Sequence, residues 1–377
     1  MPNTIFITGA SGFLGRHLIR RLLRDTRNVL YVLARSQTTE EDLIDEFAWA
    51  DVARIKIVRG DVTLPRLGLG RDMIEHLATK TREVWHTAAA TQFADAYKDV
   101  VDATNVHGTH NVLGLSSSFP HLHTLYYMST AYVCGVQRGR VAEDALPKPM
   151  AFNNHYERSK YEAERLVRSS RLPFVIVRPS ILVGDSHTGE ARGERSRVIY
   201  GYILGVYHAI LRLFASEMEF WSGWKVRAAS NPLDVNLRLY GSPLATKNFL
   251  TVDDAVNVCM AVRASRDKIG KTFNAVNANN LTLQSMLDSF QPLLKVRGIR
   301  YEPGLSLSQI SVRENPAEAF AFKATRDFRP YAIGPEPRWV TDNVDRLGVQ
   351  RIRMTRQLFR FVIRSYVQRH LRGRLCR

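Results

Sequence analysis

Tyr156 and Lys160 are the residues of this chain best suited to proton transfer. They stand four positions apart in a stretch with helical patterning, which places a phenol and an ammonium on one face. A free phenol titrates near pH ~10, and a neighbouring positive charge lowers its pKa toward a useful range. Upstream, the hydroxyl of Ser129 or of Thr130 can hydrogen-bond a substrate oxygen or simply cap a strand end. Such a tyrosine and lysine are common as a surface pair, so their meaning depends on the rest of the chain.

A glycine-rich turn opens the chain directly after its first apolar run. Gly9, Gly12 and Gly15 are separated by two residues each. Glycines allow a tight turn, a close approach to a pyrophosphate and close helix packing, and a helix N-terminus attracts phosphate charge. An ordinary tight turn is the alternative. The pattern therefore predicts a dinucleotide site formed by Gly9, Ser11, Gly12, Phe13, Leu14 and Gly15.

Arg35 indicates which dinucleotide this is. It stands twenty residues beyond Gly15, where the second apolar run ends and where an NAD site usually offers a carboxylate to the ribose. A guanidinium instead forms paired bonds with a 2′-phosphate. We therefore expect NADP(H) in preference to NAD(H), with a merely solvated Arg35 as the alternative.

The elements that must position these residues alternate along the chain. Helical stretches such as Gly12–Arg24, 103–118 and 156–170 separate seven apolar runs, which we expect to be strands: Thr4–Thr8, 29–34, 55–59, 83–87, 124–129, 174–178 and 272–276. Such alternation is typical of a parallel sheet covered on both faces. We predict an α/β, Rossmann-type doubly wound fold with a smaller, mainly helical substrate-binding part.

The expected division follows from where this alternation is interrupted. Residues 1–190 form the NADP-binding Rossmann domain, completed by about 248–278, and residues 191–247 and 279–350 form the substrate-binding part. The interruption holds an apolar helix, 198–214, followed by Trp221 and Trp224. Arg195, Arg197, His208 and Arg212 in and before that helix favour burial in protein over a membrane span.

The charge is concentrated at the carboxyl end. Residues 351–377 carry nine arginines and no acidic residue, out of a net charge of +17, and their apolar residues recur at helical spacing. We expect a basic amphipathic helix that either docks on the body or meets an anionic surface. No nucleic-acid-binding module is recognisable, and the three scattered cysteines predict neither a disulfide framework nor a metal site. The chain starts without a basic leader, so we expect a cytoplasmic location, with peripheral membrane contact as an option.

The glycine spacing resembles the TGxxGxxG motif of extended short-chain dehydrogenases/reductases. Within that group, several motifs resemble the fatty acyl reductase (male-sterility) and thioester-reductase branch: 60–69, 86–93, 105–109, 129–133, 178–181 and 184–189. The resemblance covers roughly residues 4–190. It implies NADPH-dependent reduction of an acyl thioester, on coenzyme A or an acyl carrier protein, to an aldehyde and in some members to an alcohol. Separately, the basic tail is expected to attract anionic lipid, the phosphates of coenzyme A or an acidic acyl carrier protein.

The resemblance also assigns residues. Thr130, five positions before Gly135, takes the place of the catalytic hydroxyl, beside Tyr156 and Lys160, and Lys160 also holds the cofactor ribose. Further cofactor contacts are implied at Asp61, Val62, Ala88, Ala89, Asn105 and Pro179. The apolar helix and its tryptophans could line an acyl tunnel or be plain core.

Two other functions remain open from the sequence. The same tyrosine and lysine would serve a dehydrogenase or epimerase acting on a ketone, an alcohol, a sterol-like compound or a nucleotide sugar. A non-catalytic NADP(H) sensor is the second alternative, although a sensor does not need a proton donor.

Overall fold

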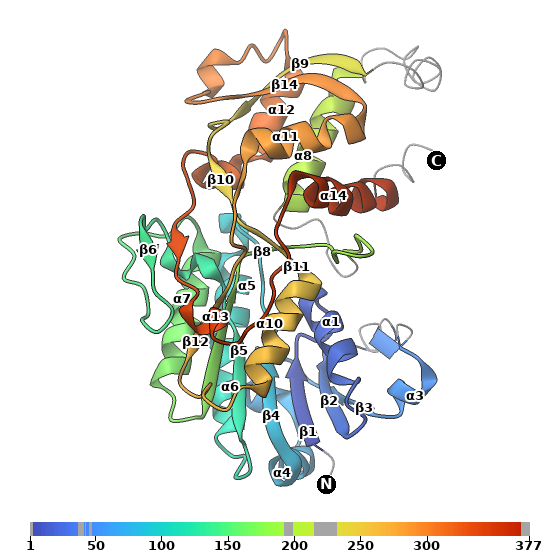
Figure 1. Ribbon diagram of the computed structural model, residues 1–377, viewed down its shortest axis with the longest axis vertical. Coiled ribbons are helices and arrows are strands. Elements are labelled where there is room, and N and C mark those ends of the chain that lie inside the picture. The colour runs from blue at the N-terminus through green and yellow to red at the C-terminus, as the bar shows by residue number, and fades with distance from the viewer. Residues whose placement is uncertain are drawn as a thin grey trace.

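The computed structural model describes residues 3–36, 41, 43–44, 47–191, 199–214 and 232–370. In Figure 1 a parallel sheet occupies the lower half of the molecule, and a smaller group of helices and short strands lies above it. Trp221 and Trp224, and with them Arg195, Arg197 and the last seven residues of the chain, lie outside the described residues.

The sheet contains the seven strands that the sequence predicts. All neighbouring strands run parallel, in the order β12-β7-β5-β4-β1-β2-β3. Their bounds are β1 Asn3–Thr8, β2 Asn28–Ala34, β3 Ile55–Arg59, β4 Thr81–His86, β5 Thr124–Met128, β7 Phe174–Pro179 and β12 Thr272–Ala275. This order brings the carboxyl ends of β1, β4, β5 and β7 together at one edge, the usual place for ligands in such a sheet.

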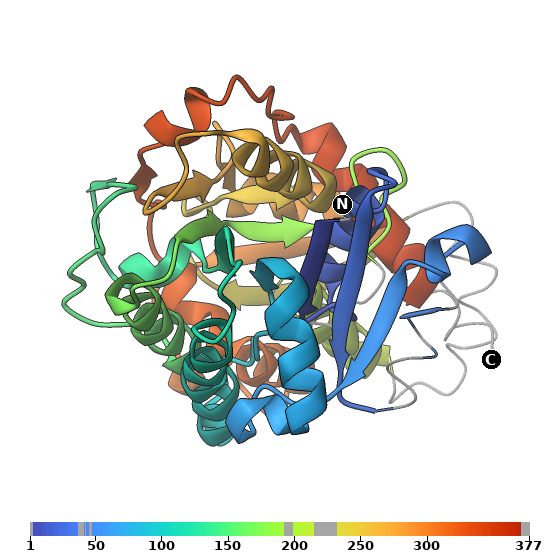
Figure 2. The same cartoon turned by 90° about the horizontal axis from the view of Figure 1, so that it is seen from below.

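Both faces of the sheet are covered, as a doubly wound fold requires. Alternate residues of each strand enter different cores: Ile5 and Ile7 pack with α1 and α10, whereas Phe6 packs with α4, α6 and α7. Figure 2 shows the helices on the two sides of the strands. The covering helices are α1 Phe13–Leu22 and α10 Val252–Ala264 on one face, and α4 Arg71–Lys80, α6 Gly108–Ser116 and α7 His155–Ser169 on the other.

Shorter elements connect this framework. Helical segments are α3 Trp49–Val52, η1 Pro65–Gly68, η2 Asp95–Tyr97, α5 Lys98–Asp102, the π-helical η3 Ala103–His107, η4 Ala131–Cys134 and α13 Asp342–Asp345. Small two-stranded pairs join β6 Arg140–Val141 to β15 Arg338–Trp339, β8 Ile181–Val183 to β11 Phe249–Thr251, and β10 Thr246–Lys247 to β13 Leu281–Thr282. Two of these pairs bring residues 249–251 beside the segment that follows β7, and residues 338–339 beside β6.

The smaller part is built around the apolar helix α8 Ile199–Phe214, which packs on α12 Pro316–Ala324. It also holds a parallel pair of strands, β9 Leu233–Tyr240 and β14 Val296–Glu302, with α11 Leu283–Phe290, η5 Pro292–Leu294, η6 Leu307–Gln309 and η7 Arg326–Tyr331. Tyr200, Ile203 and Val206 of α8 are fully buried, so the expected burial of this helix in protein is confirmed. Among the described residues, no helix is both long and apolar enough to cross a membrane. The division into domains stays a prediction.

The carboxyl-terminal helix begins later than the sequence suggests. Helix α14 spans Arg356–His370, and residues 351–355 have no regular secondary structure. The backbone of Ile352 donates to Asp254 at 3.0 Å and that of Met354 donates to Asn277 at 3.2 Å, which holds the segment out of the helix. The apolar side of α14 is buried on the body through Phe359, Val362, Ile363, Tyr366 and Val367. Its docking is thus observed, and a role toward an anionic surface stays a prediction.

A buried ion pair holds α7 on the sheet. Arg178 of β7 donates from Nε to Glu164 Oε2 at 3.0 Å and from Nη2 to Glu164 Oε1 at 2.5 Å, and both side chains are fully buried. The guanidinium also donates to the carbonyls of Ala142 and Ala145. A charge pair buried this completely is satisfied only while both partners are present.

We therefore predict that Arg178→Met lowers the free energy of unfolding by about 3–5 kcal/mol, because it leaves the Glu164 carboxylate without its main partner. The matched control is Arg165→Met on α7, the helix that carries Glu164, where an exposed pair with Glu162 contributes at most about 1 kcal/mol. Urea unfolding followed by circular dichroism measures both. Equal losses for the two variants would contradict this role of the buried pair.

Candidate active site

The glycine turn sits between β1, β4 and the start of α1. Gly9 has φ +75°, and a Cβ there would lie 2.4 Å from the backbone nitrogen of Ala88, so only glycine fits. A Cβ on Gly15 would lie 2.2 Å from the carbonyl oxygen of Gly9. Helix α1 starts after Gly12 with no side-chain cap and no acidic residue in its first turn. The open N–H groups of this helix end suit an anion.

A buried histidine fixes the strand beneath this turn. Thr109 donates to the carbonyl of Asn105 at 2.6 Å, so its oxygen accepts from His86 Nε2 at 3.0 Å. His86 Nδ1 then accepts from the Thr8 hydroxyl at 2.7 Å. Burial, with a smaller contribution from the Lys160 charge, lowers the pKa of His86 to about 3. The imidazole is therefore neutral and links the ends of β1 and β4 to α6.

One cavity of about 280 Å³ opens at the carboxyl ends of the strands. It brings together eleven of the candidate site residues named from the sequence, namely Gly9, Gly12, Phe13, Leu14, Gly15, Ala89, Ser129, Thr130, Tyr156, Lys160 and Pro179. They come from the turns after β1, β4, β5 and β7 and from the first turns of α7. The glycine turn and the tyrosine–lysine pair therefore face the same space.

Lys160 and Tyr156 project from α7 toward this cavity. Asn154 caps the helix by accepting from the backbone of Glu157 at 3.0 Å. The Lys160 ammonium donates to the carbonyl of Met128 at 2.6 Å and lies 4.3 Å from the centre of the Tyr127 ring. Burial lowers the pKa of Lys160 to about 7, although the Glu164 charge opposes this shift.

The phenol of Tyr156 is a proton donor at neutral pH. Burial raises its pKa to about 12, and a hydrogen bond with Thr130 acts in the opposite direction. The hydroxyl thus keeps its proton, and Thr130 is the neighbour that interacts with it. This arrangement presents two hydroxyl groups side by side.

The structure separates the two candidate hydroxyls. Ser129 donates to Glu164 Oε2 at 2.7 Å, and this carboxylate belongs to the buried pair with Arg178. Both residues line the cavity, but the Thr130 hydroxyl interacts with Tyr156, and its oxygen accepts from the backbone of Tyr132 at 3.3 Å. The geometry therefore favours Thr130 as the hydroxyl that meets a ligand.

Six of the expected cofactor residues lie off the cavity wall: Ser11, Arg35, Asp61, Val62, Ala88 and Asn105. Arg35 is exposed directly after β2. Asp61 accepts from the backbone and hydroxyl of Thr63, both at 2.9 Å, and so shapes the turn after β3. The backbone of Ala88 packs closely against Gly9. Their contacts with a dinucleotide remain predictions.

Asn105 has its side chain committed to protein partners. Its amide oxygen accepts from the backbone of Ala90 at 2.8 Å, and its nitrogen donates to the Ala90 carbonyl at 2.9 Å and to the Ser159 hydroxyl at 2.8 Å. These bonds use both amide hydrogens. Asn105 thus fastens the loop after β4 to α7, and any influence on a cofactor passes through that loop.

Sequence reasoning missed the far wall of the cavity. Phe93 contacts Tyr156, Phe328 and Tyr331, with ring centres 5.7, 5.9 and 5.8 Å apart. The hydroxyl of Tyr331 donates to Glu157 at 2.5 Å, next to Tyr156. Lys247 and Tyr132 line the same wall. Phe93 and Tyr132 lie within the motifs 86–93 and 129–133, although no role was assigned to them, whereas Lys247, Phe328 and Tyr331 come from the carboxyl-terminal half, where no local motif marks them.

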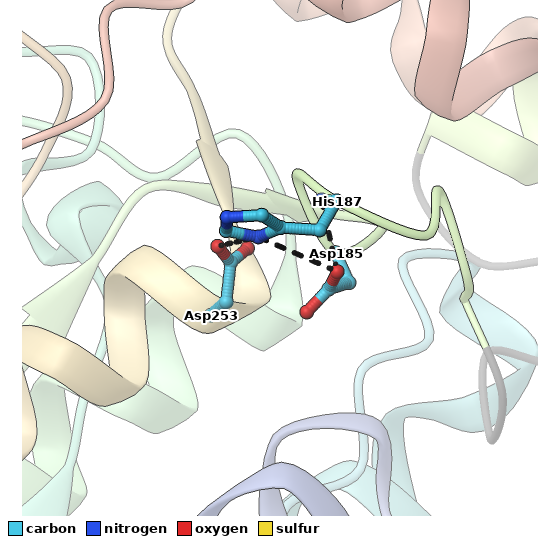
Figure 3. Close-up of side chains that lie close together, drawn as sticks. All are labelled: Asp185, His187 and Asp253. Atoms are coloured by element: carbon cyan, nitrogen blue, oxygen red, sulfur yellow. Dashed lines mark hydrogen bonds and ion pairs between the residues drawn. The ribbon is translucent and has the colours of Figure 1, made fainter.

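Asp185, His187 and Asp253 form a cluster near the start of α10 (Figure 3). Their ligand atoms lie within 4.8 Å of one another. The carboxylates already accept from the loop, since Asp185 bonds the backbone of His187 and Thr188, and Asp253 bonds Ser186. The hydrogen bonds of this cluster hold the loop of residues 185–188 on α10.

Comparison with known proteins identifies the family of the chain. The family model described as male sterility protein, an NAD-binding family, matches residues 7–229. The fatty acyl-CoA reductase wat of Drosophila melanogaster is 27% identical over 259 residues, which cover 57% of this chain and 50% of the relative. The chain thus spans about half of that relative's length.

Two solved structures share the fold over nearly the whole chain. One is the terminal R domain from the myxalamid PKS-NRPS biosynthetic pathway, with a TM-score of 0.75 and 23% identity, covering 98% of this chain and 91% of that one. The other is the UDP-glucuronic acid 4-epimerase from Bacillus cereus in complex with NAD, with a TM-score of 0.65 and 16% identity, covering 98% of each.

The neutral state of His86 predicts a pH dependence of stability. Its folded pKa of about 3 lies below the ordinary value of 6.5, so the unfolded chain binds this proton first and stability falls as the pH drops from 6.5 toward 3. Between about pH 7 and about pH 5 this contribution is about 2 kcal/mol. We expect His86→Gln to lose less stability over that interval than the wild type, as measured by urea unfolding at each pH.

The exposed His121 provides the matched control, and His121→Gln should keep the wild-type pH dependence. An unchanged pH dependence in His86→Gln would show that His86 is not held neutral.

Proposed function

The chain belongs to the male sterility protein family and is an NAD(P)-dependent oxidoreductase of the extended short-chain dehydrogenase/reductase type, and we propose that it reduces an acyl thioester to an aldehyde with NADPH. One observation carries this proposal. The glycine turn, Thr130, Tyr156 and Lys160 all line a single cavity at the carboxyl edge of the sheet. The fatty acyl-CoA reductase among the relatives supports a thioester as the substrate.

The residues around the glycine turn fit a dinucleotide. The absence of a Cβ at Gly9 allows the close approach to Ala88, and the uncapped start of α1 offers N–H groups to a pyrophosphate. Lys160 would hold ribose hydroxyls, and the exposed guanidinium of Arg35 would hold the 2′-phosphate of NADPH. The bound cofactor supplies a hydride to the thioester carbonyl carbon.

The chain's own hydroxyls then act on the substrate oxygen. Thr130 and Tyr156 donate hydrogen bonds to that oxygen as it gains negative charge, and Tyr156 can pass its proton to it. Collapse of the resulting hemithioacetal breaks the carbon–sulfur bond and releases the thiol and the aldehyde. Lys160, one helical turn after Tyr156 in α7, donates to the Met128 carbonyl, and its positive charge would favour loss of the phenol proton.

A second function is favoured by one observation. The fold matches a nucleotide-sugar epimerase over 98% of both chains, and the tyrosine and lysine would serve ketone chemistry equally well.

To separate these functions, purified protein is incubated with NADPH and a panel of acyl-CoAs, ketones and nucleotide sugars, and the loss of reduced-cofactor absorbance is followed. Oxidation with acyl-CoAs supports the proposal, whereas oxidation confined to ketones or sugars favours the alternative. Tight NADPH binding without oxidation across the panel would indicate a sensor.

Tyr156→Phe is expected to reduce turnover by about a hundredfold or more, because one donor to a developing oxyanion contributes ~2.7–4 kcal/mol. NADPH binding, measured by fluorescence titration, should stay close to that of the wild type. Thr130→Ala should lose turnover similarly, whereas Ser129→Ala should chiefly lower stability through the lost bond to Glu164. Wild-type turnover in Tyr156→Phe, or a greater loss in Ser129→Ala than in Thr130→Ala, contradicts these roles.

Arg35→Ala is expected to weaken NADPH binding by about tenfold or more, since a charge-assisted bond to the 2′-phosphate contributes ~1.5–3 kcal/mol. NADH lacks that phosphate, so its dissociation constant should change little. Arg24→Ala, which removes another exposed arginine beyond the far end of α1, is the control. Isothermal titration calorimetry measures both cofactors, and equal weakening of the two would remove Arg35 from the NADPH site.

A further inference from the structure

A second polar group lies on the cavity wall, away from the tyrosine–lysine pair. The ammonium of Lys247, in β10, lies 2.7 Å from Glu336 Oε1, and the side chains are 10% and 3% exposed. No pattern in the sequence pointed to either Lys247 or Glu336. A charged pair buried this far carries a desolvation cost, so its presence at a ligand cavity calls for an explanation.

The ammonium is incompletely bonded. An ammonium has three hydrogens to donate, and among the described residues Glu336 is the hydrogen-bond acceptor that meets it. Tyr132 donates to the same oxygen at 3.0 Å and so competes for it rather than satisfying Lys247. Two N–H groups of a nearly buried cation therefore remain for a ligand in the cavity.

A second unused donor lies on the neighbouring segment. Ser180 is 6% exposed and lines the cavity, and within the described part of the chain its hydroxyl has no hydrogen-bond partner. The backbone of Ile181, the next residue, donates to the carbonyl of Asn248, which follows Lys247, at 3.3 Å. Buried polar groups are normally bonded, so two unsatisfied donors on adjoining segments indicate a missing acceptor.

The surroundings identify the kind of acceptor. Glu336 already balances the charge of Lys247, and the Glu157 carboxylate lies nearby beneath Tyr331. With Arg138 as a second positive charge, the two carboxylates and the two cations balance, so no net charge attracts an anion, whereas a neutral oxygen can accept from the ammonium. The rest of the cavity lining is largely apolar and includes the aromatic side chains of Phe93, Phe328 and Tyr331. The wall thus suits an apolar group that carries an oxygen.

We propose that Lys247, assisted by Ser180, binds a neutral oxygen of the thioester substrate other than the reacting carbonyl. The substrate class would then be acyl thioesters with a hydroxyl, oxo or amide oxygen near the thioester, in the acyl group or in the pantetheine arm. This inference rests on the proposed thioester reduction. Lys247 acts as a specificity-determining residue, and the chemistry stays with Thr130, Tyr156 and Lys160.

The test compares matched thioesters in wild type and in a double variant, Lys247→Met with Glu336→Gln, which removes both charges so that neither is left unpaired. The acyl arm uses octanoyl-CoA against 3-hydroxyoctanoyl-CoA. The thiol arm uses octanoyl-CoA against the ethyl thioester of octanoic acid. We expect the wild type to prefer the oxygen-bearing member of one arm by about tenfold or more in kcat/KM, mainly through KM.

In the double variant that preference should disappear, with the rate on the ethyl thioester within about threefold of wild type. A matched control, Lys271→Met with Asp267→Asn, removes a lysine–carboxylate pair from outside the cavity and should keep the preference. Equal rates for all thioesters in wild type, or a preference that survives in the folded double variant, would overturn the inference alone. Failure to reduce any thioester would overturn the proposed function and this inference together.

Discussion

The carboxylate of Glu164 is the constraint on which the site depends. It is fully buried and accepts from Arg178 of β7, from Arg168 of its own helix and from Ser129 after β5. These bonds hold α7 on the sheet at Glu164, one helical turn after Lys160. Because Ser129 is turned toward Glu164, the next residue, Thr130, is the one that faces Tyr156. A single buried acceptor thus decides which hydroxyls meet in the cavity.

Burial also sets the protonation of the pair. It raises the pKa of Tyr156 to about 12 and lowers that of Lys160 to about 7, and Glu164 counteracts the second shift. The phenol therefore enters the reaction with its proton, as a reductase requires. The Glu164 carboxylate favours the charged form of Lys160. The same strand ends hold the glycine turn, which explains how donor and cofactor site share one edge.

Local patterns predicted much of this arrangement. The seven strands followed from short apolar runs, and the meeting of Gly9, Thr130 and Tyr156 followed from parallel strands ending at one edge. The pairing of Lys247 with Glu336 could not be predicted from local patterns, because it joins residues 89 positions apart through tertiary packing. The late start of α14 likewise depends on Asp254 and Asn277, which bind the backbone of Ile352 and Met354 before the helix begins.

The central claim is that the electrons leave NADPH for a thioester carbon. The most direct test incubates the purified protein with NADPH and octanoyl-CoA and measures oxidised cofactor, free coenzyme A thiol and trapped aldehyde in the same sample. The account predicts that thiol and aldehyde appear together, in amounts matched by the NADPH consumed. Consumption of NADPH without release of thiol would contradict it.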